Sequence, residues 1–202
     1  MAKLKLGDVV EHLAGKIKSL DQKPAIIGHS MGGLVVQLLL QRDLAIAGVA
    51  IDPAPPAGVF SMEWSFIKAN FPAINPFLLN QPAMMTFEQF RYAFVNTLPL
   101  DEQRAAYDRY AVPESRGVPT SSLGAAGRVD FKRTRAPLLI TAGERDHIIP
   151  ASLPRANYKK YLGTSNITDF REFAGRDHFL IGSKGWEEVA EYALNWIEQK
   201  AD

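Results

Sequence analysis

The sequence contains no cysteine among its 202 residues. Disulfide bonds, thiolate metal ligands and cysteine nucleophiles are therefore excluded together. It also lacks an excess of charge of either sign, because 23 basic residues stand against 22 acidic residues for a formal net charge of +1. Such a surface offers no single-sign field that would attract nucleic acid or an anionic membrane. We therefore expect neither of them as a partner.

Long apolar segments are missing as well. The longest, residues 32–40, is interrupted by Gln37 and falls far short of the roughly 20 residues that span a bilayer. The N-terminal sequence MAKLKLGDVV contains no apolar stretch followed by a small-residue cleavage site, so it does not read as a secretory signal. We therefore expect a cytoplasmic protein without a membrane span.

What the sequence does contain is the composition of an ordinary globular domain, with 47% hydrophobic and 22% charged residues. Its apolar runs predict strands over residues 24–28, 45–51, 136–142 and 166–173. Helical spacing predicts helices over residues 31–41, 151–162 and 186–199. Buried runs without alternation, separated by helices, indicate a parallel sheet that is covered on both faces. The predicted fold class is therefore α/β, with a reduced and mostly parallel sheet.

Two of the predicted helices carry further expectations. Near the N-terminus, apolar residues repeat at helical spacing (Val10, Leu13, Ile17 and Leu20), and Asp8 is a suitable N-cap for that helix. In the helix over residues 31–41, Gln37 and Gln41 fall on one polar side.

A different composition marks residues 57–135, which hold most of the aromatic side chains and several prolines. Its aromatic residues include Phe60, Trp64, Phe66, Phe71, Phe77, Phe87, Phe90, Tyr92 and Phe94. We interpret this segment as a helical cap inserted between two core parts, residues 1–56 and 136–202. Most of its aromatic side chains are expected to pack the core of the insertion itself.

The chemical signal begins with a Gly-x-Ser-x-Gly motif from Gly28 to Gly32, centred on Ser30. The motif lies between a predicted strand and a predicted helix, which is the setting that a nucleophile elbow requires. Glycines are needed in such a turn because neighbouring side chains would clash. The turn lifts the serine hydroxyl above the sheet edge and directs the Met31 N–H at a developing oxyanion.

A serine nucleophile needs a base, and the base needs an acid that orients it. Asp146 follows the strand predicted over residues 136–142, and His178 follows the strand predicted over residues 166–173. Both therefore leave the carboxyl ends of parallel strands, at the edge where Ser30 also emerges. The order serine, aspartate, histidine is the one expected for this architecture. Asp177 and Glu144 are rival candidates for the acid.

These residues resemble the α/β-hydrolase superfamily, and more narrowly its capped, non-secreted, esterase-like members. The matching segments are GHSMGG (residues 28–33), AGERDHIIP (residues 142–150) and FAGRDHF (residues 173–179). The resemblance implies a Ser–His–Asp triad, an acyl-enzyme intermediate and no cofactor. His29, His147 and Phe179 adjoin the three triad positions and are candidate substrate-binding residues. No histidine has metal-ligand spacing, and residues 28–33 lack the lysine of a phosphate-binding loop.

The sequence departs from this family at its start, because the strands that normally precede the first predicted helix have no room. Two expectations follow. The strand over residues 24–28 should have an open edge, which favours a homodimer through that edge. The oxyanion hole should also lack its second donor, which would lower the rate by roughly a hundred to a thousandfold.

The sequence therefore predicts a serine esterase in which Ser30 is the nucleophile, His178 the base, Asp146 the acid and Met31 the oxyanion donor. Its partner would be a small-molecule ester, with an apolar group of modest size. Three alternatives stay open. The same triad could serve a C–C bond hydrolase, a lactonase or a perhydrolase. The chain could be a non-catalytic binding protein. It could also be a fragment of a longer enzyme.

Overall fold

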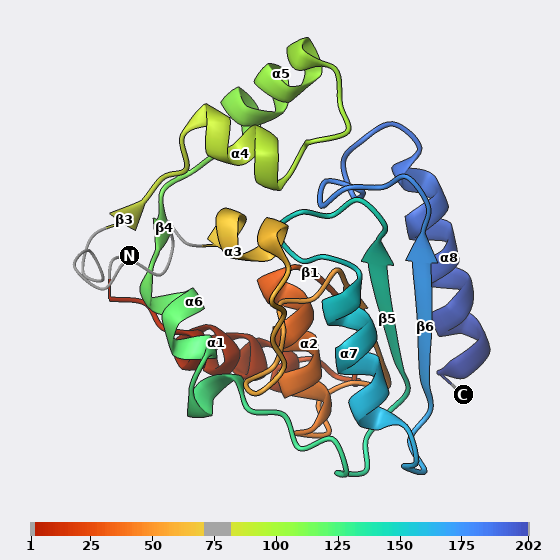
Figure 1. Cartoon of the computed structure of the whole chain (residues 1–202). Helices are drawn as coiled ribbons and strands as arrows, with labels where there is room; N and C mark the ends of the chain where they lie inside the picture. Colours follow the sequence, from red (N-terminus) through yellow and green to blue (C-terminus); the bar gives the residue numbers. More distant parts are fainter. Residues whose placement is uncertain (1–2, 71–81, 202) are drawn as a thin grey trace.

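A single parallel sheet forms the centre of the molecule in a computed structural model that describes residues 3–70 and 82–201. Its strands run in the order β1 (Ala25–His29), β2 (Ala47–Ile51), β5 (Leu138–Gly143) and β6 (Thr168–Phe173) (Figure 1). All three pairings are parallel, with Ile27 beside Val49 and Leu139 beside Asp169. The predicted α/β class with a mostly parallel sheet is confirmed.

Helices cover both faces of this sheet. One face packs against α1 (Leu6–Lys18), α2 (Met31–Leu40) and α7 (Ser152–Tyr161), and the other packs against α8 (Trp186–Lys200) (Figure 1). Every residue of β2 and β5 is buried, which explains why their sequences run apolar without alternation.

Helix α2 is buried almost all round rather than on one side. Gln37, predicted to lie on a polar side, is fully buried. Its side-chain oxygen accepts hydrogen bonds from the Asn157 Nδ2 and the Tyr161 hydroxyl of α7, each at 3.0 Å. A buried amide is tolerated here because its partners are buried with it.

The start of α1 also differs from the prediction. The helix begins at Leu6, so Asp8 is its third residue rather than its N-cap. The Asp8 carboxylate accepts the Lys5 N–H at 2.9 Å, and it therefore stabilises the helix start from inside the first turn.

Strand β1 has a neighbour on one side only within the described residues. Its side chains are only partly buried, and Ile27 is 50% exposed. The expected open edge is therefore present in the described part of the chain.

Between β2 and β5 the chain forms a series of short elements. They are α3 (Trp64–Asn70), β3 (Pro82–Ala83), α4 (Phe87–Ala93), α5 (Leu100–Tyr110), β4 (Glu114–Ser115), α6 (Gly117–Ser122) and the 3-10 helix η3 (Ala125–Gly127). Figure 1 shows α3, α4 and α5 beyond the carboxyl ends of the strands, while α6 lies beside α1. The boundaries and the cap role of residues 57–135 stay predictions.

The aromatic side chains of this segment divide into two groups. Phe90 is buried and stacks on Phe94, with ring centroids 5.1 Å apart, as predicted for an internal core. Phe60 and Trp64 are instead 74% and 72% exposed, so they do not belong to such a core. Phe71 and Phe77 lie outside the described residues.

No helix in the described part of the chain is both long and apolar enough to cross a membrane.

Candidate active site

Ser30 occupies a tight turn between β1 and α2. Its φ of 56° lies in the left-handed region, which non-glycine residues rarely adopt. Backbone hydrogen bonds hold it there: the Ser30 N–H donates to the Ile51 carbonyl, and its own carbonyl accepts from the N–H groups of Gly33 and Ala54, each at 2.9 Å. These bonds compensate for a strained conformation at the carboxyl edge of the sheet.

The glycines of the motif are not equivalent. A Cβ on Gly28 would collide with the Gly32 carbonyl and approach the Val36 side chain at 2.9 Å. A Cβ on Gly33 would lie 2.8 Å from Pro53. A Cβ on Gly32 would meet nothing within 4 Å. The predicted need for glycine therefore holds at Gly28 and fails at Gly32.

Met31 is the first residue of α2. The first N–H groups of a helix have no intrahelical acceptor, and the helix dipole places partial positive charge there. The Met31 N–H therefore belongs to an end of α2 that favours negative charge.

Asp146 and His178 form a buried hydrogen-bonded pair. Asp146 lies in the loop after β5, His178 lies in the loop after β6, and the His178 Nδ1 is 2.6 Å from the Asp146 Oδ2. The other carboxylate oxygen, Oδ1, accepts the N–H groups of Ile148 and Ile149 at 2.9 and 2.8 Å. Both side chains of the pair are fully buried.

The two rival acids have other partners. Asp177 accepts the Thr97 N–H and hydroxyl at 3.0 and 2.7 Å and the Phe179 N–H at 3.0 Å. Glu144 accepts the Gly175 N–H at 2.7 Å and is exposed. The carboxylate that contacts His178 is that of Asp146.

Burial shifts the protonation of the pair. Desolvation lowers the pKa of His178 to about 4, because the charged imidazolium is disfavoured away from water. Desolvation raises the pKa of Asp146 to about 7, partly offset by the hydrogen bonds that the carboxylate accepts. An imidazole that stays neutral is able to accept a proton.

Two aromatic rings enclose His178. The ring centroids of His29 and Phe94 lie 4.4 and 4.8 Å from that of His178, and the His29 Nε2 is 2.9 Å from the His178 carbonyl oxygen. The His178 Nε2 is buried without a hydrogen-bond partner, and it makes no hydrogen bond to Ser30. The nitrogen that a base would use is therefore unoccupied by any group of the described chain.

A third buried acid, Asp52, was not identified from the sequence. It directly follows β2, has a φ of 41° and is fully buried. Its Oδ2 accepts the Gly143 N–H at 3.0 Å. Asp52 follows the carboxyl end of a predicted buried strand, just as Asp146 and His178 each follow one. This placement is the signal that could have revealed Asp52 from the sequence.

Asp52, Asp146 and His178 also form the one group among the described residues with the side-chain types and spacing of a metal site, their ligand atoms all lying within 4.8 Å of one another. The His178 Nδ1 and the Asp146 Oδ2 are already paired with each other at 2.6 Å. The arrangement therefore fits a hydrogen-bonded cluster better than a metal centre.

A cavity of about 640 Å³ opens at Ser30. Ser30, Met31 and His29 line it from the elbow, and apolar residues supply most of the remaining wall. These include Phe66 of α3, Val118 of α6 and Ile149 from the loop after β5. The size and lining are those of a small-molecule pocket.

Two of the predicted substrate-binding residues do not reach this cavity. The His147 Nδ1 is 2.9 Å from the Tyr92 carbonyl oxygen, and the two rings are 4.7 Å apart. Phe179 packs its ring 5.5 Å from that of Tyr110. Both side chains turn to the helices of the insertion, whereas His29 lines the cavity.

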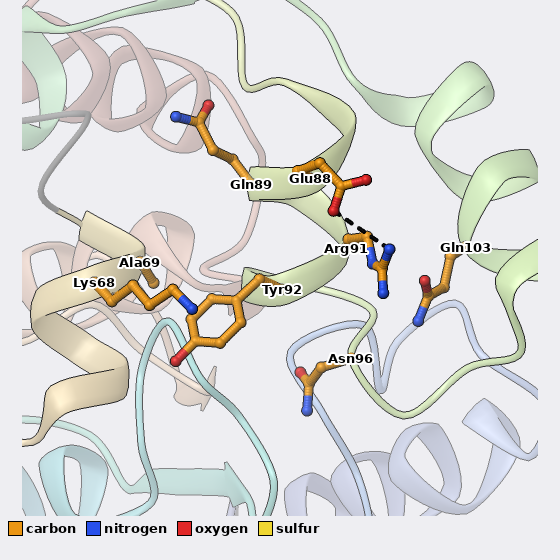
Figure 2. Close-up of a pocket in the computed structure, with 8 residues that line it drawn as sticks. All are labelled: Lys68, Ala69, Glu88, Gln89, Arg91, Tyr92, Asn96 and Gln103. Carbon is orange, nitrogen blue, oxygen red and sulfur yellow. Dashed lines mark ion pairs between the residues drawn. The ribbon is translucent and has the colours of Figure 1, made fainter.

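A second hollow, of about 500 Å³, lies between α3, α4 and α5 and shares no lining residue with the first. Figure 2 shows its polar lining, in which the Lys68 Nζ lies 3.9 Å from the centroid of the Tyr92 ring. Arg91 forms an ion pair with Glu88 at 3.3 Å. Its lining contains no serine or histidine, so it offers no nucleophile and base.

A parallel α/β sheet with a strained serine at a strand-to-helix turn, and a buried aspartate–histidine pair at the same edge, defines the class of α/β proteins with a nucleophile elbow. The family model of the alpha/beta hydrolase family matches residues 4–192. The chain belongs to this family, and its membership supports a hydrolase activity. No curated protein matches the sequence.

Solved structures with this fold are described by different activities. A monoacylglycerol lipase from Paleococcus ferrophilus is 21% identical with a TM-score of 0.70, and the match covers 97% of this chain and 76% of the lipase. A Mycobacterium tuberculosis H37Rv protein described as a non-heme bromoperoxidase is 17% identical with a TM-score of 0.72, and the match covers 98% of this chain and 76% of that protein. A variant of tomato methylketone synthase I, complexed with beta-ketoheptanoate, is 12% identical with a TM-score of 0.68. The match covers 97% of this chain and 79% of the synthase. At these identities the likeness shows the fold alone.

Proposed function

We propose that this protein hydrolyses carboxylic esters through an acyl-enzyme intermediate, with Ser30 as nucleophile, His178 as base and Asp146 as acid. The observation on which the proposal rests is the 2.6 Å hydrogen bond between His178 and Asp146 at the sheet edge where the strained Ser30 also lies. A neutral imidazole with an unoccupied Nε2 is the group that a serine nucleophile requires.

The proposed reaction has two halves. The Ser30 Oγ attacks the acyl carbon while its proton passes to the His178 Nε2, and the Met31 N–H donates to the resulting oxyanion. His178 then returns the proton to the alcohol as the alcohol leaves. Water attacks the acyl group by the same route, releasing the acid and restoring Ser30. Asp146 stabilises the imidazolium in both halves, and the Ser30 hydroxyl must turn to Nε2 before the first.

The substrate we propose is an ester with an apolar acyl or alcohol group of modest size. The cavity at Ser30 supports this choice, because most of its wall is apolar. The insertion, residues 57–135, would act as the cap that limits this pocket, since Phe66 and Val118 belong to it. Because structures with this fold include proteins described as a bromoperoxidase and a methylketone synthase, fold alone does not choose the reaction.

We also propose that the open edge of β1 pairs with the same strand of a second copy. The support is that β1 is partly buried with one neighbouring strand among the described residues, and that Ile27 is half exposed. An unpaired edge of a parallel sheet is a template for strand addition.

The test is turnover of short-chain p-nitrophenyl esters by the purified protein beside Ser30→Ala. We expect the variant to lose essentially all activity, since removal of a triad member costs on the order of 10⁴ to 10⁶ in kcat. Ser19→Ala is the matched control, because Ser19 is an exposed serine after α1 whose hydroxyl bonds the Lys16 carbonyl. It should turn over substrate like the parent protein.

The same samples should be assayed with diketone, lactone and peroxide substrates. Faster turnover of one of these, also lost in Ser30→Ala, would keep the triad and replace the ester assignment. A folded protein that turns over none of them and is not labelled at Ser30 by a fluorophosphonate would contradict the catalytic proposal in favour of a binding role.

A further inference from the structure

Asp52 is a buried acid that the proposed triad does not use. It is fully buried at the carboxyl end of β2, and its backbone is held by a bond from its N–H to the Thr141 carbonyl at 3.2 Å. Its φ of 41° is in the left-handed region. A buried carboxyl group in a strained conformation is costly, so its surroundings must compensate for it.

The hydrogen bonds of Asp52 are incomplete if it is ionised. Oδ2 accepts the Gly143 N–H, but Oδ1 is buried and has no hydrogen-bond partner among the residues that the structure describes. An ionised carboxylate accepts hydrogen bonds only, whereas a protonated one also donates. A proton on Asp52 would therefore turn an unpartnered acceptor into a donor.

The acceptor for such a donor is nearby. The ligand atoms of Asp52, Asp146 and His178 lie within 4.8 Å of one another, and all three side chains are buried. Two carboxylates this close cannot both ionise at low cost away from water. Burial raises the pKa of Asp52 well above its usual range, and the neighbouring Asp146 adds to the shift.

We infer that Asp52 and Asp146 share a single proton, so that a neutral Asp52 donates a hydrogen bond to the Asp146 carboxylate and holds it in place for His178. This role makes Asp52 a positioning residue, and it rests on the proposed triad. The Asp146 carboxylate is then bound from three sides: by two backbone N–H groups, by His178 and by Asp52.

The arrangement has a consequence when Asp146 is replaced. In Asp146→Asn the new amide donates a hydrogen bond, so Asp52 no longer needs its proton and becomes the carboxylate beside His178. A negative charge then remains next to the imidazolium. In the double variant Asp52→Asn/Asp146→Asn no charge remains.

A double-mutant cycle tests the inference. We expect Asp52→Asn to keep kcat within about threefold, because its amide N–H replaces the carboxyl O–H as donor. Asp52→Leu removes the donor, and kcat should fall about tenfold or more while KM changes little. In the Asp146→Asn background, Asp52→Asn should cost a further tenfold or more in kcat.

Asp169→Asn is the control for loss of one negative charge, because Asp169 lies near the start of β6 and bonds the Trp196 Nε1 at 2.7 Å. The effect of Asp169→Asn on kcat should be the same in the parent protein and in Asp146→Asn. An equal effect of Asp52→Asn in both backgrounds would overturn the inference.

Infrared spectroscopy gives a readout that does not depend on turnover. At about pH 9, above the pKa of about 7 to which burial raises Asp146, the parent protein should still show the carbonyl stretch of a protonated, buried carboxyl group, and Asp52→Asn should lose it. If Ser30→Ala retained full activity, the proposed triad would be wrong, but the infrared band would still test whether Asp52 and Asp146 share a proton. A parent protein without the band would overturn the inference whatever its activity.

Discussion

Non-glycine residues with positive φ are concentrated at the site. Three non-glycine residues of the described chain have such a backbone, and two of them, Ser30 and Asp52, end neighbouring strands of the sheet. Each such residue costs on the order of 1–3 kcal/mol. The third, Asp43, lies in the turn after α2 and pairs with Lys23 at the surface. Strain is therefore concentrated where the proposed chemistry requires a fixed side chain.

The pH dependence of turnover follows from the buried pair. Asp146 is expected to lose its proton near pH 7, while His178 is neutral above about pH 4. The working base is a neutral His178 backed by an ionised Asp146, so activity should rise as the pH passes upward through about 7 and be lost below it. The groups that face this pair are Asp52 and Asp177, which are buried, and His29, which is partly buried.

The measurement is kcat/KM for a non-ionising ester between pH 5 and 9. A midpoint near 4, where His178 itself takes up a proton, would contradict the assignment of Asp146 as the group that controls the acid limb.

At the scale of elements, the site depends on how closely β1 and α2 approach. The elbow places the end of β1 against the first turn of α2, and Gly28 leaves no room for a side chain between them. The same closeness recurs where Gly48 of β2 meets Leu40 and Val36 of α2. Small residues on two strands thus let one buried helix lie directly on the sheet.

Gly28→Ala should therefore destabilise the protein. The added Cβ overlaps the Gly32 carbonyl and crowds Val36, and overpacking of this kind costs about 1–3 kcal/mol. The free energy of unfolding, obtained from urea denaturation, is the measurement.

Gly32→Ala is the matched control, because its Cβ would enter open space in α2. Alanine is the better helix former, so stability should stay level or increase by at most about 1 kcal/mol. Similar losses in both variants would show that the elbow backbone, and not contact with its neighbours, requires the glycines.

At the scale of the whole molecule, the sheet has two unequal edges. Strand β6 ends the sheet on one side, where Trp196 of α8 bonds Asp169 and Lys200 lies 3.9 Å from the same carboxylate. Strand β1 ends it on the other, and α8 packs against β2 and not over Ile27, which stays half exposed. The apolar surface at β1 is the one that association would cover.

We expect the protein to have twice the 22.3 kDa mass of one chain at micromolar concentration, measured by light scattering or sedimentation. Ile27→Lys should give monomers, because a charge on an edge strand opposes strand addition.

Leu194→Lys is the control, since Leu194 is 54% exposed on α8 and is not part of the edge strand. It should leave the mass at twice that of one chain. A parent protein that is monomeric at these concentrations would contradict the proposed dimer.

The order of elements and the edge of the site were predictable from local pattern. Apolar runs located β2 and β5 within a few residues, and the Gly-x-Ser-x-Gly motif located the elbow, because strands and tight turns are encoded by neighbours in sequence. Predictions failed where burial depends on distant partners. Gln37 reads as a surface residue until Asn157 and Tyr161 are placed beside it. Phe60 and Trp64 belong to the aromatic insertion in sequence, but both side chains are mostly exposed.

The sequence by itself determined the α/β class and the placement of Ser30, Asp146 and His178 at one sheet edge, because parallel strands bring their carboxyl ends together. Only the tertiary structure decided that Asp146, and not Asp177, bonds His178, that His147 and Phe179 turn away from the cavity, and that Asp52 joins the cluster. These outcomes depend on side chains that follow separate strands and meet where they are buried from solvent. There the hydrogen bonds and the protonation state of each group depend on those of its neighbours.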